Sequence, residues 1–305
     1  MAEFSIIDTY FNRKSPHSVD LGVGDDSALL TPPPQQQLVI CADTLVAGRH
    51  FPLDTSPHAI GWKSVAVNLS DIAAMGAKPQ SILLALSLPQ IDHDWLKGFS
   101  QGLYDCCDQF GVSLIGGDTT QSPHLTISVT ALGWVDIGQA VTRSAAQVGD
   151  LICVSGTVGD AAFALQHLGH PLQRRLDYPT PRCELGQALK GLAHSMIDVS
   201  DGLAQDLGHI LKASHVGATL QLDQLPINTA LQDVTREQQW QYALAGGDDY
   251  ELCFTISPQN YEKLLQQQNH SSISVIGKID AEIGLRFQQN GLDHSLQFNG
   301  YQHFA

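Results

Sequence analysis

Residues 80–88 read QSILLALSL, a continuous apolar run with the length of a β-strand. Upstream of it, Ser56-Pro57 supplies the N-cap and first position of a helix that we predict over residues 57–74. Gly76 and Pro79 end that helix before the strand begins. A helix followed directly by a buried strand is typical of α/β proteins, so this stretch predicts that fold class.

The segments on either side repeat this alternation of helix and strand. In the first half we predict helices over 3–11 and 92–110, the second ended by Gly111, and strands over 37–46, 112–115 and 125–135. In the second half we predict strands over 151–155, 196–199, 251–256 and 272–279, helices over 161–168, 184–193 and 203–213, and a β-rich last thirty residues. Residues 136–149 read as a link. The sequence therefore predicts a mixed α/β (α+β) fold with two domains, 1–137 and 138–305.

The composition limits what the chain can bind. Its 305 residues are 43% hydrophobic and 15% charged, with a formal charge of −15, which predicts a globular acidic protein. Such a surface repels phosphate backbones and anionic lipids, so we expect neither nucleic acid nor a membrane as a partner. We see no signal peptide, and the six cysteines show no zinc spacing, so we expect a cytoplasmic protein with free thiols. Cys106-Cys107 are expected to pack in a core, and Arg174-Arg175 to form a solvated turn.

Several standard catalytic motifs are missing from the chain. It contains no P-loop, no zinc-protease HExxH, no GxSxG and no protein-kinase HRD motif. Gly22-Val23-Gly24 begins like a dinucleotide fingerprint, but Ser27 stands where the third glycine belongs. Chemistry that depends on those motifs is therefore not indicated.

The motif that recurs is aspartate beside glycine, serine or threonine, usually at the end of a predicted strand. An aspartate in such a place offers a hard oxygen ligand next to a backbone that can approach a ligand closely, although aspartate also favours turns. The instances are Gly24-Asp25-Asp26-Ser27, Ala42-Asp43-Thr44, Leu69-Ser70-Asp71, Gly116-Gly117-Asp118-Thr119, Asp198-Val199-Ser200-Asp201-Gly202 and Gly246-Gly247-Asp248-Asp249.

Six such motifs together indicate a site for metal ions and phosphate. Clustered carboxylates alone repel an anionic substrate, whereas magnesium ions placed between carboxylate and phosphate reverse that sign. Each magnesium ion takes only one or two carboxylates, so many aspartates imply several ions. Asp71 lies in an otherwise apolar predicted helix. Burying an unpaired carboxylate there would cost on the order of several kcal/mol. We therefore expect Asp71 to have a polar partner or a metal.

At this point the chain resembles the thiamine-monophosphate kinase family of the aminoimidazole-ribonucleotide-synthetase-like superfamily, over nearly its whole length. Eight motifs in the right order carry the resemblance. They are residues 22–26, 43–51, 66–76, 114–120, 142–144, 197–203, 246–252 and 300–304.

The resemblance implies a homodimer in which the N-terminal mixed sheet joins that of its twin, with ATP, several Mg²⁺ ions and thiamine monophosphate as ligands. It implies these magnesium ligands: Asp26, Asp43, Asp71, Asp118, Asp198 and Asp201, with Asp25 orienting its neighbour or ligating a metal itself. It implies ATP contacts from Gly117, Asp118, Arg143 and Ser200, with Tyr104 lining the nucleotide pocket. It implies that His50, Asp248 and Tyr301 face the thiamine phosphate. Asp43, Asp118 and Asp26 are the residues that we expect to be catalytic.

Two positions depart from the family pattern. Cys41-Ala42 stand where the family often has Ser-Thr, so a metal ligand there must be a backbone carbonyl or a water, or be absent. Asp248 stands where the family usually has Glu, so the carboxylate survives on a side chain one methylene shorter.

We expect direct in-line transfer of the γ-phosphoryl group of ATP to a phosphate oxygen of the acceptor. That oxygen is already ionised, so positioning and metal charge can supply the acceleration without a strong general base or a phospho-enzyme. Two alternatives remain open at this stage. The chain could be a sister synthetase with another small acceptor, or a non-catalytic nucleotide-binding regulator.

Overall fold

The computed structural model describes residues 2–13, 19–266 and 272–296, and within them the chain forms two compact units. Unit 1 contains residues up to Ile72 together with Ala77–Gly138. Unit 2 contains Ala73–Gly76 together with the residues from Gln139 onward. The chain therefore passes from one unit to the other three times.

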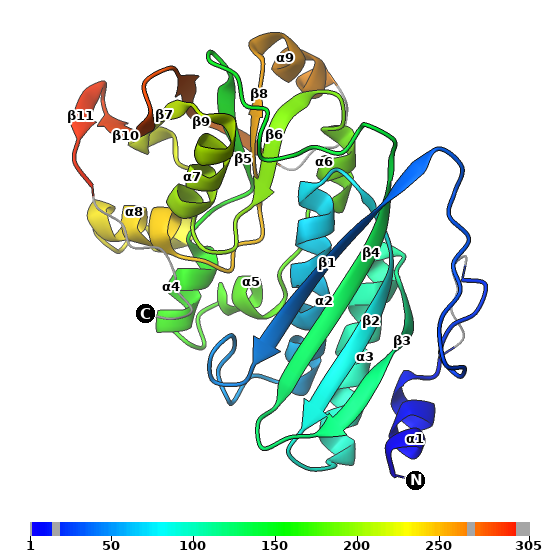
Figure 1. The fold of residues 1–305 in the computed structure, drawn as a ribbon. Coiled ribbons are helices and arrows are strands. Elements are labelled where there is room, and N and C mark those ends of the chain that lie inside the picture. The colour runs from blue at the N-terminus through cyan, green and yellow to red at the C-terminus, as the bar shows by residue number, and fades with distance from the viewer. Residues whose placement is uncertain (1, 14–18, 267–271, 297–305) are drawn as a thin grey trace. The chain divides into compact units, whose positions relative to one another are not determined.

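Unit 1 is a four-stranded mixed sheet with helices on one face (Figure 1). The strand order is β1-β4-β2-β3, in which β2 and β3 are parallel and the other pairs are antiparallel. Its elements are α1 (Ala2–Ile6), η1 (Ile7–Phe11), β1 (Gln36–Val46), α2 (Pro57–Ala74), β2 (Lys78–Leu88), α3 (His93–Phe110), β3 (Ser113–Gln121) and β4 (Thr126–Asp136).

Alternation along the strands separates a buried face from an open one. On β2, Leu84, Leu86 and Leu88 are buried, whereas Leu83, Ala85 and Ser87 between them are not. The helices α2 and α3 cover the buried face. The open face is partly apolar, because Leu38 pairs with Trp134 and Ile40 with Leu132 across β1 and β4. Leu38 and Ile40 are 42% and 57% exposed.

Unit 2 contains a seven-stranded sheet in the order β11-β10-β7-β9-β5-β8-β6. Its main core gathers side chains from the strands and from α7 and α8 around the buried Trp240. The strands are β5 (Leu151–Ser155), β6 (Ala193–Asp198), β7 (Gly217–Gln221), β8 (Leu252–Ile256), β9 (Ile273–Asp280), β10 (Gly284–Gln289) and β11 (Leu292–His294). The helices are α4 (Asp160–Gln166), α5 (Gln173–Asp177), α6 (Cys183–Ala188), α7 (Leu203–Ser214), η2 (Leu222–Gln224), η3 (Thr229–Leu231), α8 (Arg236–Ala245) and α9 (Pro258–Gln266).

Most elements predicted from the sequence are confirmed, with local causes that can be named. Ser56 caps α2, because its hydroxyl accepts a hydrogen bond from the amide of Ala59 at 3.2 Å. Asp92 caps α3 by accepting from the amides of Asp94 and Trp95, and Gly111 ends that helix with a φ of +67°. Cys106 and Cys107 are buried, as expected.

Some predictions were wrong in extent or missed an element. The predicted helix over 184–193 is shorter, since α6 ends at Ala188 and β6 begins at Ala193. The strand predicted over 112–115 is longer, because β3 runs through the two glycines to Gln121. The sequence reading also missed α5, β7, α8 and α9. No helix in the described part of the chain is long and apolar enough to cross a membrane.

Candidate active site

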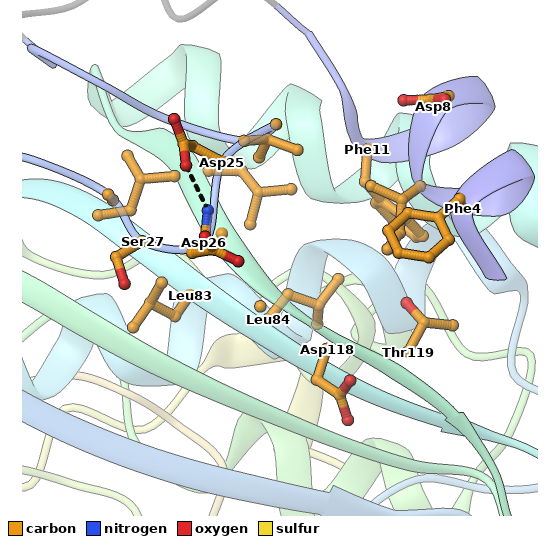
Figure 2. Close-up of a pocket in the computed structure, with 18 of the residues that line it drawn as sticks. Phe4, Asp8, Phe11, Asp25, Asp26, Ser27, Leu83, Leu84, Asp118 and Thr119 are labelled. Atoms are coloured by element: carbon orange, nitrogen blue, oxygen red, sulfur yellow. Dashed lines mark hydrogen bonds between the residues drawn. The ribbon is translucent and has the colours of Figure 1, made fainter.

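A pocket of about 980 Å³ lies at the β3 edge of the unit 1 sheet. The N-terminal helices, the loop around Asp25 and Asp26, and β3 with Asp118 line it, together with Leu83 and Leu84 of β2 and Leu132 of β4 (Figure 2). Four of the residues singled out from the sequence, Asp25, Asp26, Gly117 and Asp118, therefore share one pocket. Figure 2 shows the aspartate loop on one side of this space and Asp118 on the other, with Phe4 and Phe11 of the N-terminal helices nearby.

The backbone of β3 leaves no room for a side chain at Gly117 beside this pocket. Gly117 pairs with Leu84, just past a register shift between Ile82 and Leu83, and has a φ of +150°. A Cβ on Gly117 would lie 1.8 Å from the carbonyl oxygen of Leu84. Only glycine fits that position, and Asp118 follows it on the open face of the sheet, paired with Ala85.

The loop on the other side of the pocket is held by its own carboxylate. Asp25 Oδ1 accepts a hydrogen bond from the amide of Asp26 at 2.8 Å. The loop is closed at its base by an antiparallel bridge between Leu21 and Leu29. This hydrogen bond holds the backbone of Asp26 against Asp25, and the two roles considered for Asp25 stay predictions.

A second acidic group, Asp43 and Asp71, lies at the opposite edge of the same sheet, on its buried face. Asp43 is two residues after Cys41 on β1, and its amide donates to Asn68 Oδ1 at 3.0 Å. The Cys41 thiol donates to the Asn68 carbonyl oxygen at 3.3 Å and hydrogen-bonds Asp71. Burial and the neighbouring charges of Asp71 and Asp43 raise the pKa of that thiol well above its usual value. Asp71 thus has the polar partner that was expected for it.

These two acidic groups do not meet within one chain. Asp43 stands in the cross-strand row of Val129, Leu84 and Gly117, so three strand spacings, about 14 Å, separate β1 from β3 at this level. Asp118 is one residue beyond Gly117 and points to the other face. Among the residues that the structure describes, no three His, Cys, Asp or Glu side chains form a group that could hold a metal ion. Ligation by these aspartates therefore stays a prediction.

The backbone at Cys41-Ala42 remains able to supply a ligand. Among the strands that the structure describes, β1 lies at the edge of its sheet and pairs with β4. Because successive carbonyls of a strand point to opposite sides, one of these two carbonyls faces away from β4, toward the open edge.

Two other predicted contacts of unit 1 have structural partners. His50 Nδ1 accepts a hydrogen bond from the amide of Val46 at 3.0 Å, which holds the ring at the end of β1. The Tyr104 hydroxyl donates to the carbonyl oxygen of Phe11 at 2.8 Å, and the Arg13 guanidinium lies over its ring. Tyr104 is not among the residues that line the pocket. Burial raises the pKa of Tyr104 to about 12.

Unit 2 carries a third acidic group where β6 gives way to α7. Asp198 ends β6 and is buried, and Asp201 and Ser200 follow it in the loop. Asp206, from the first turn of α7, accepts hydrogen bonds at 3.0–3.1 Å from the amides of Ser200, Asp201 and Gly202. Burial and the charge of Asp198 raise the pKa of Asp206 to about 7, although those amides oppose the shift. Excess negative charge of this kind suits a cation.

The loop between α8 and β8 packs against the Asp198–Gly202 loop. The amides of Asp248 and Tyr250 donate to the carbonyls of Ser200 and Val199 at 2.9 and 2.8 Å. The Tyr250 hydroxyl donates to Asp248 Oδ1 at 2.9 Å. The predicted acceptor residue Asp248 and the predicted ATP contact Ser200 are therefore neighbours.

Behind this loop lies a buried ionic cluster around Glu251. The carboxylate of Glu251 is fully buried and accepts from Arg175, from both Nε and Nη2 of Arg182, and from the Ser155 hydroxyl. The expectation that Arg174-Arg175 forms a solvated turn was wrong for Arg175, whose side chain is 22% exposed and ion-paired. The prediction failed because the partner lies 76 residues away in sequence.

Two further residues, Arg143 and Tyr301, were predicted to contact ligands. Arg143 is exposed, and its carbonyl oxygen accepts from the Ser214 hydroxyl. Tyr301 lies outside the described residues. The sequence reading did not single out the N-terminal helix side chains Phe4, Ile7 and Phe11 as pocket residues. Their i, i+3, i+7 spacing places them on one apolar face of a helix, and this pattern in the sequence could have indicated them.

Comparison with known proteins places this architecture in a class. Residues 24–135 match the model of the AIR synthase related protein, N-terminal domain, and residues 147–289 match the corresponding C-terminal domain. The two units with their separate sheets are thus the two domains of the AIR synthase related class.

Individual relatives identify the family within this class to which the chain belongs. Thiamine-monophosphate kinase of Escherichia coli O157:H7 is 47% identical over 99% of this chain and 98% of its own length. The crystal structure of thiamine-monophosphate kinase from Stenotrophomonas maltophilia K279a has a TM-score of 0.85 and 45% identity, covering 95% of this chain and 96% of that one. AaThiL, solved in complex with AMPPCP and TMP, has a TM-score of 0.78 and 27% identity, covering 99% and 96%. The chain belongs to the thiamine-monophosphate kinase family.

Proposed function

We propose that this protein transfers the γ-phosphoryl group of ATP to thiamine monophosphate, giving thiamine diphosphate, in one in-line step assisted by several Mg²⁺ ions. The observation that carries the proposal is full-length similarity to thiamine-monophosphate kinases at 47% identity, together with a pocket that gathers Asp25, Asp26 and Asp118 beside Gly117. The complex of AaThiL with AMPPCP and TMP, an ATP analogue and the acceptor, supports the same pair of substrates.

The residues present fit magnesium as the cation. The candidate ligands are carboxylates and, at Cys41-Ala42, backbone carbonyls, the hard oxygen donors that Mg²⁺ prefers, and the carboxylates lie in separate groups, as several ions require. When bound, the ions would neutralise phosphate charge during transfer. Asp26, Asp43, Asp71, Asp118, Asp198 and Asp201 would hold them, and Asp25 and Asp206 would orient the loops that carry these ligands.

The chain's own residues account for the rest of the step. Gly117, Arg143 and Ser200 would contact ATP, and His50, Asp248 and Tyr301 would contact the acceptor. The acceptor oxygen is ionised before it reacts, so these residues need only align donor and acceptor and exclude water. We assign ATP binding and dimerisation to residues 1–137, with residues 138–305 as the second domain. The six free cysteines suit a cytoplasmic location.

The open face of the unit 1 sheet supports a homodimer. Leu38 and Ile40 project from it with Trp134 and Leu132 beside them, and an apolar sheet face of this kind is usually covered. The Asp43 and Asp118 groups of unit 1 do not meet within one chain, and a dimer could bring such groups together from two protomers. We therefore propose that the Asp43 group of one protomer and the Asp118 group of its partner complete one site.

The first test is release of ADP in a coupled assay with ATP and Mg²⁺, with and without thiamine monophosphate. We expect release that depends on the acceptor and produces thiamine diphosphate. Slow ADP release at the same rate with and without the acceptor would instead favour a nucleotide-binding regulator. Activity with a different small acceptor would favour a sister synthetase.

The shared site has its own test. Asp43→Ala and Asp118→Ala should each be inactive as a pure protein. After co-expression of the two variants, heterodimers would contain one intact site, so part of the wild-type turnover should return. If heterodimers isolated through a different affinity tag on each variant stay inactive, each site lies within one protomer.

A further inference from the structure

We propose that Tyr250 is a positioning residue for the acceptor: its hydroxyl holds the Asp248 carboxylate in one orientation, and the buried cluster around Glu251 holds the segment that carries both. The proposal rests on the assignment of Asp248 to the acceptor in the proposed function. It concerns how a shorter carboxylate than the usual Glu can do this work.

The backbone of this segment is strained at the two residues concerned. Asp248 has a φ of +68° and Tyr250 a φ of +51°, both in the left-handed region. Aspartate tolerates that region better than most residues, because its short side chain can bond locally, whereas a tyrosine there is uncommon. Asp248 therefore suits this backbone better than a longer glutamate would. Strain of this kind persists only where the surroundings determine the conformation.

Backbone hydrogen bonds on both sides determine it here. Besides the amides of Asp248 and Tyr250, which donate to the Asp198–Gly202 loop, the amide of Val199 donates to the carbonyl of Glu251 at 2.8 Å. Gly247 allows this contact, since a Cβ there would lie 2.3 Å from the carbonyl oxygen of Ser200. The segment is thus locked to the loop that carries Asp198 and Asp201.

The side chains of Asp249 and Glu251 anchor the segment from behind. Asp249 is buried and accepts from the amides of Gly159 and Ala161, at 2.6 and 3.3 Å. Glu251 accepts from two arginines, and Gly156 leaves room for it, because a Cβ there would lie 2.2 Å from Glu251 Oε1. Buried charges that are paired and hydrogen-bonded are expensive to displace, so this anchor is rigid.

Tyr250 transmits that rigidity to Asp248. The tyrosine is only 7% exposed, so its ring has little freedom, and its hydroxyl donates to Asp248 Oδ1 at 2.9 Å. A hydrogen bond to a carboxylate is among the stronger ones, and a site needs its contacting groups held by such second partners. Asp248 therefore meets the acceptor already oriented.

The test compares Tyr250→Phe with Tyr242→Phe. Tyr242 is a matched control: it is 8% exposed, and its hydroxyl donates to Gln166 Oε1 of α4 at 2.9 Å, a partner outside the Asp248 loop. We expect Tyr250→Phe to raise KM for thiamine monophosphate about tenfold, the effect of losing one hydrogen bond to a charged group. KM for ATP, kcat and Tm should change little, and Tyr242→Phe should leave all four near wild type.

A double-mutant cycle with Asp248→Asn separates the possible failures. In the Asp248→Asn background, Tyr250→Phe should add less than twofold to KM, because the two residues act as one unit. If Asp248→Asn raises KM but Tyr250→Phe behaves like Tyr242→Phe, the positioning role is refuted and the proposed function stands. If Asp248→Asn leaves KM unchanged, the acceptor contact itself is refuted. If the wild-type protein does not phosphorylate thiamine monophosphate, the proposed function fails before either comparison.

Discussion

Replacing Gly117 by alanine tests whether β3 can accommodate a side chain beside the pocket. The new Cβ would lie 1.8 Å from the carbonyl oxygen of Leu84, where an ordinary contact needs about 3.5 Å, so one strand must move by about 1.7 Å. Overpacking of this kind costs about 1–3 kcal/mol. A φ of +150° adds about 1–3 kcal/mol for a residue with a side chain. We therefore expect the free energy of unfolding to fall by about 2–6 kcal/mol.

Gly138→Ala is the matched control. Gly138 also has a positive φ, +75°, but a Cβ there would meet nothing within 4 Å. It should cost only the backbone penalty, about 1–2 kcal/mol. Urea denaturation of both variants gives the comparison. Equal losses would refute the reasoning, because the contact between the new Cβ and Leu84 would then contribute nothing. If Gly117→Ala still folds, its turnover should fall too, since Asp118 moves with the strand.

Three further predictions concern other parts of the molecule. Asp92→Ala removes the cap of α3 and should lower the free energy of unfolding by about 1 kcal/mol in urea denaturation; a loss under about 0.3 kcal/mol would show that the cap contributes nothing. Burial raises the pKa of Cys153 and of Cys183 to about 12, so both thiols stay protonated in the folded protein while unfolded thiols ionise near pH 9. Their contribution to stability is complete below pH 9 and declines as the pH rises toward 12, by about 1.4 kcal/mol per thiol per pH unit. Between pH 8 and 10 the double variant with alanine at both positions should lose less stability than the wild type, and parallel losses would contradict the assignment. Chelation of divalent cations should abolish the phosphoryl transfer, and added Mg²⁺ should restore it; full turnover in EDTA would exclude the metal role.

Local signals in the sequence account for much of the fold. The N-cap Ser56 predicted the start of α2 and the stop at Gly111 predicted the end of α3, both to within a residue or two, because each acts through hydrogen bonds or dihedrals only a few residues away. The missed helix α8 had the same kind of signal, a capping box from Thr235 to Gln238. That helix was predictable.

What the sequence could not reveal depends on contacts between distant residues. Nothing local says that β4 inserts between β1 and β2, and that insertion separates Asp43 from Asp118. Likewise, Arg175 looks like a surface residue until β8 brings Glu251 to it. The aspartate motifs pointed to the pocket residues Asp25, Asp26 and Asp118, but not to the division of the acidic residues into separate groups.

The three passages of the chain between the units limit how far this protein can be treated as modular. Ala73–Gly76 belong by their packing to unit 2, and Gly186 is a glycine because a Cβ there would lie 2.2 Å from the carbonyl oxygen of Ala73. A fragment beginning at Gln139 would therefore lack a piece of its own interior. Exchange of whole domains between relatives, whether by recombination or by an engineer, has to carry the end of α2 along with the C-terminal half.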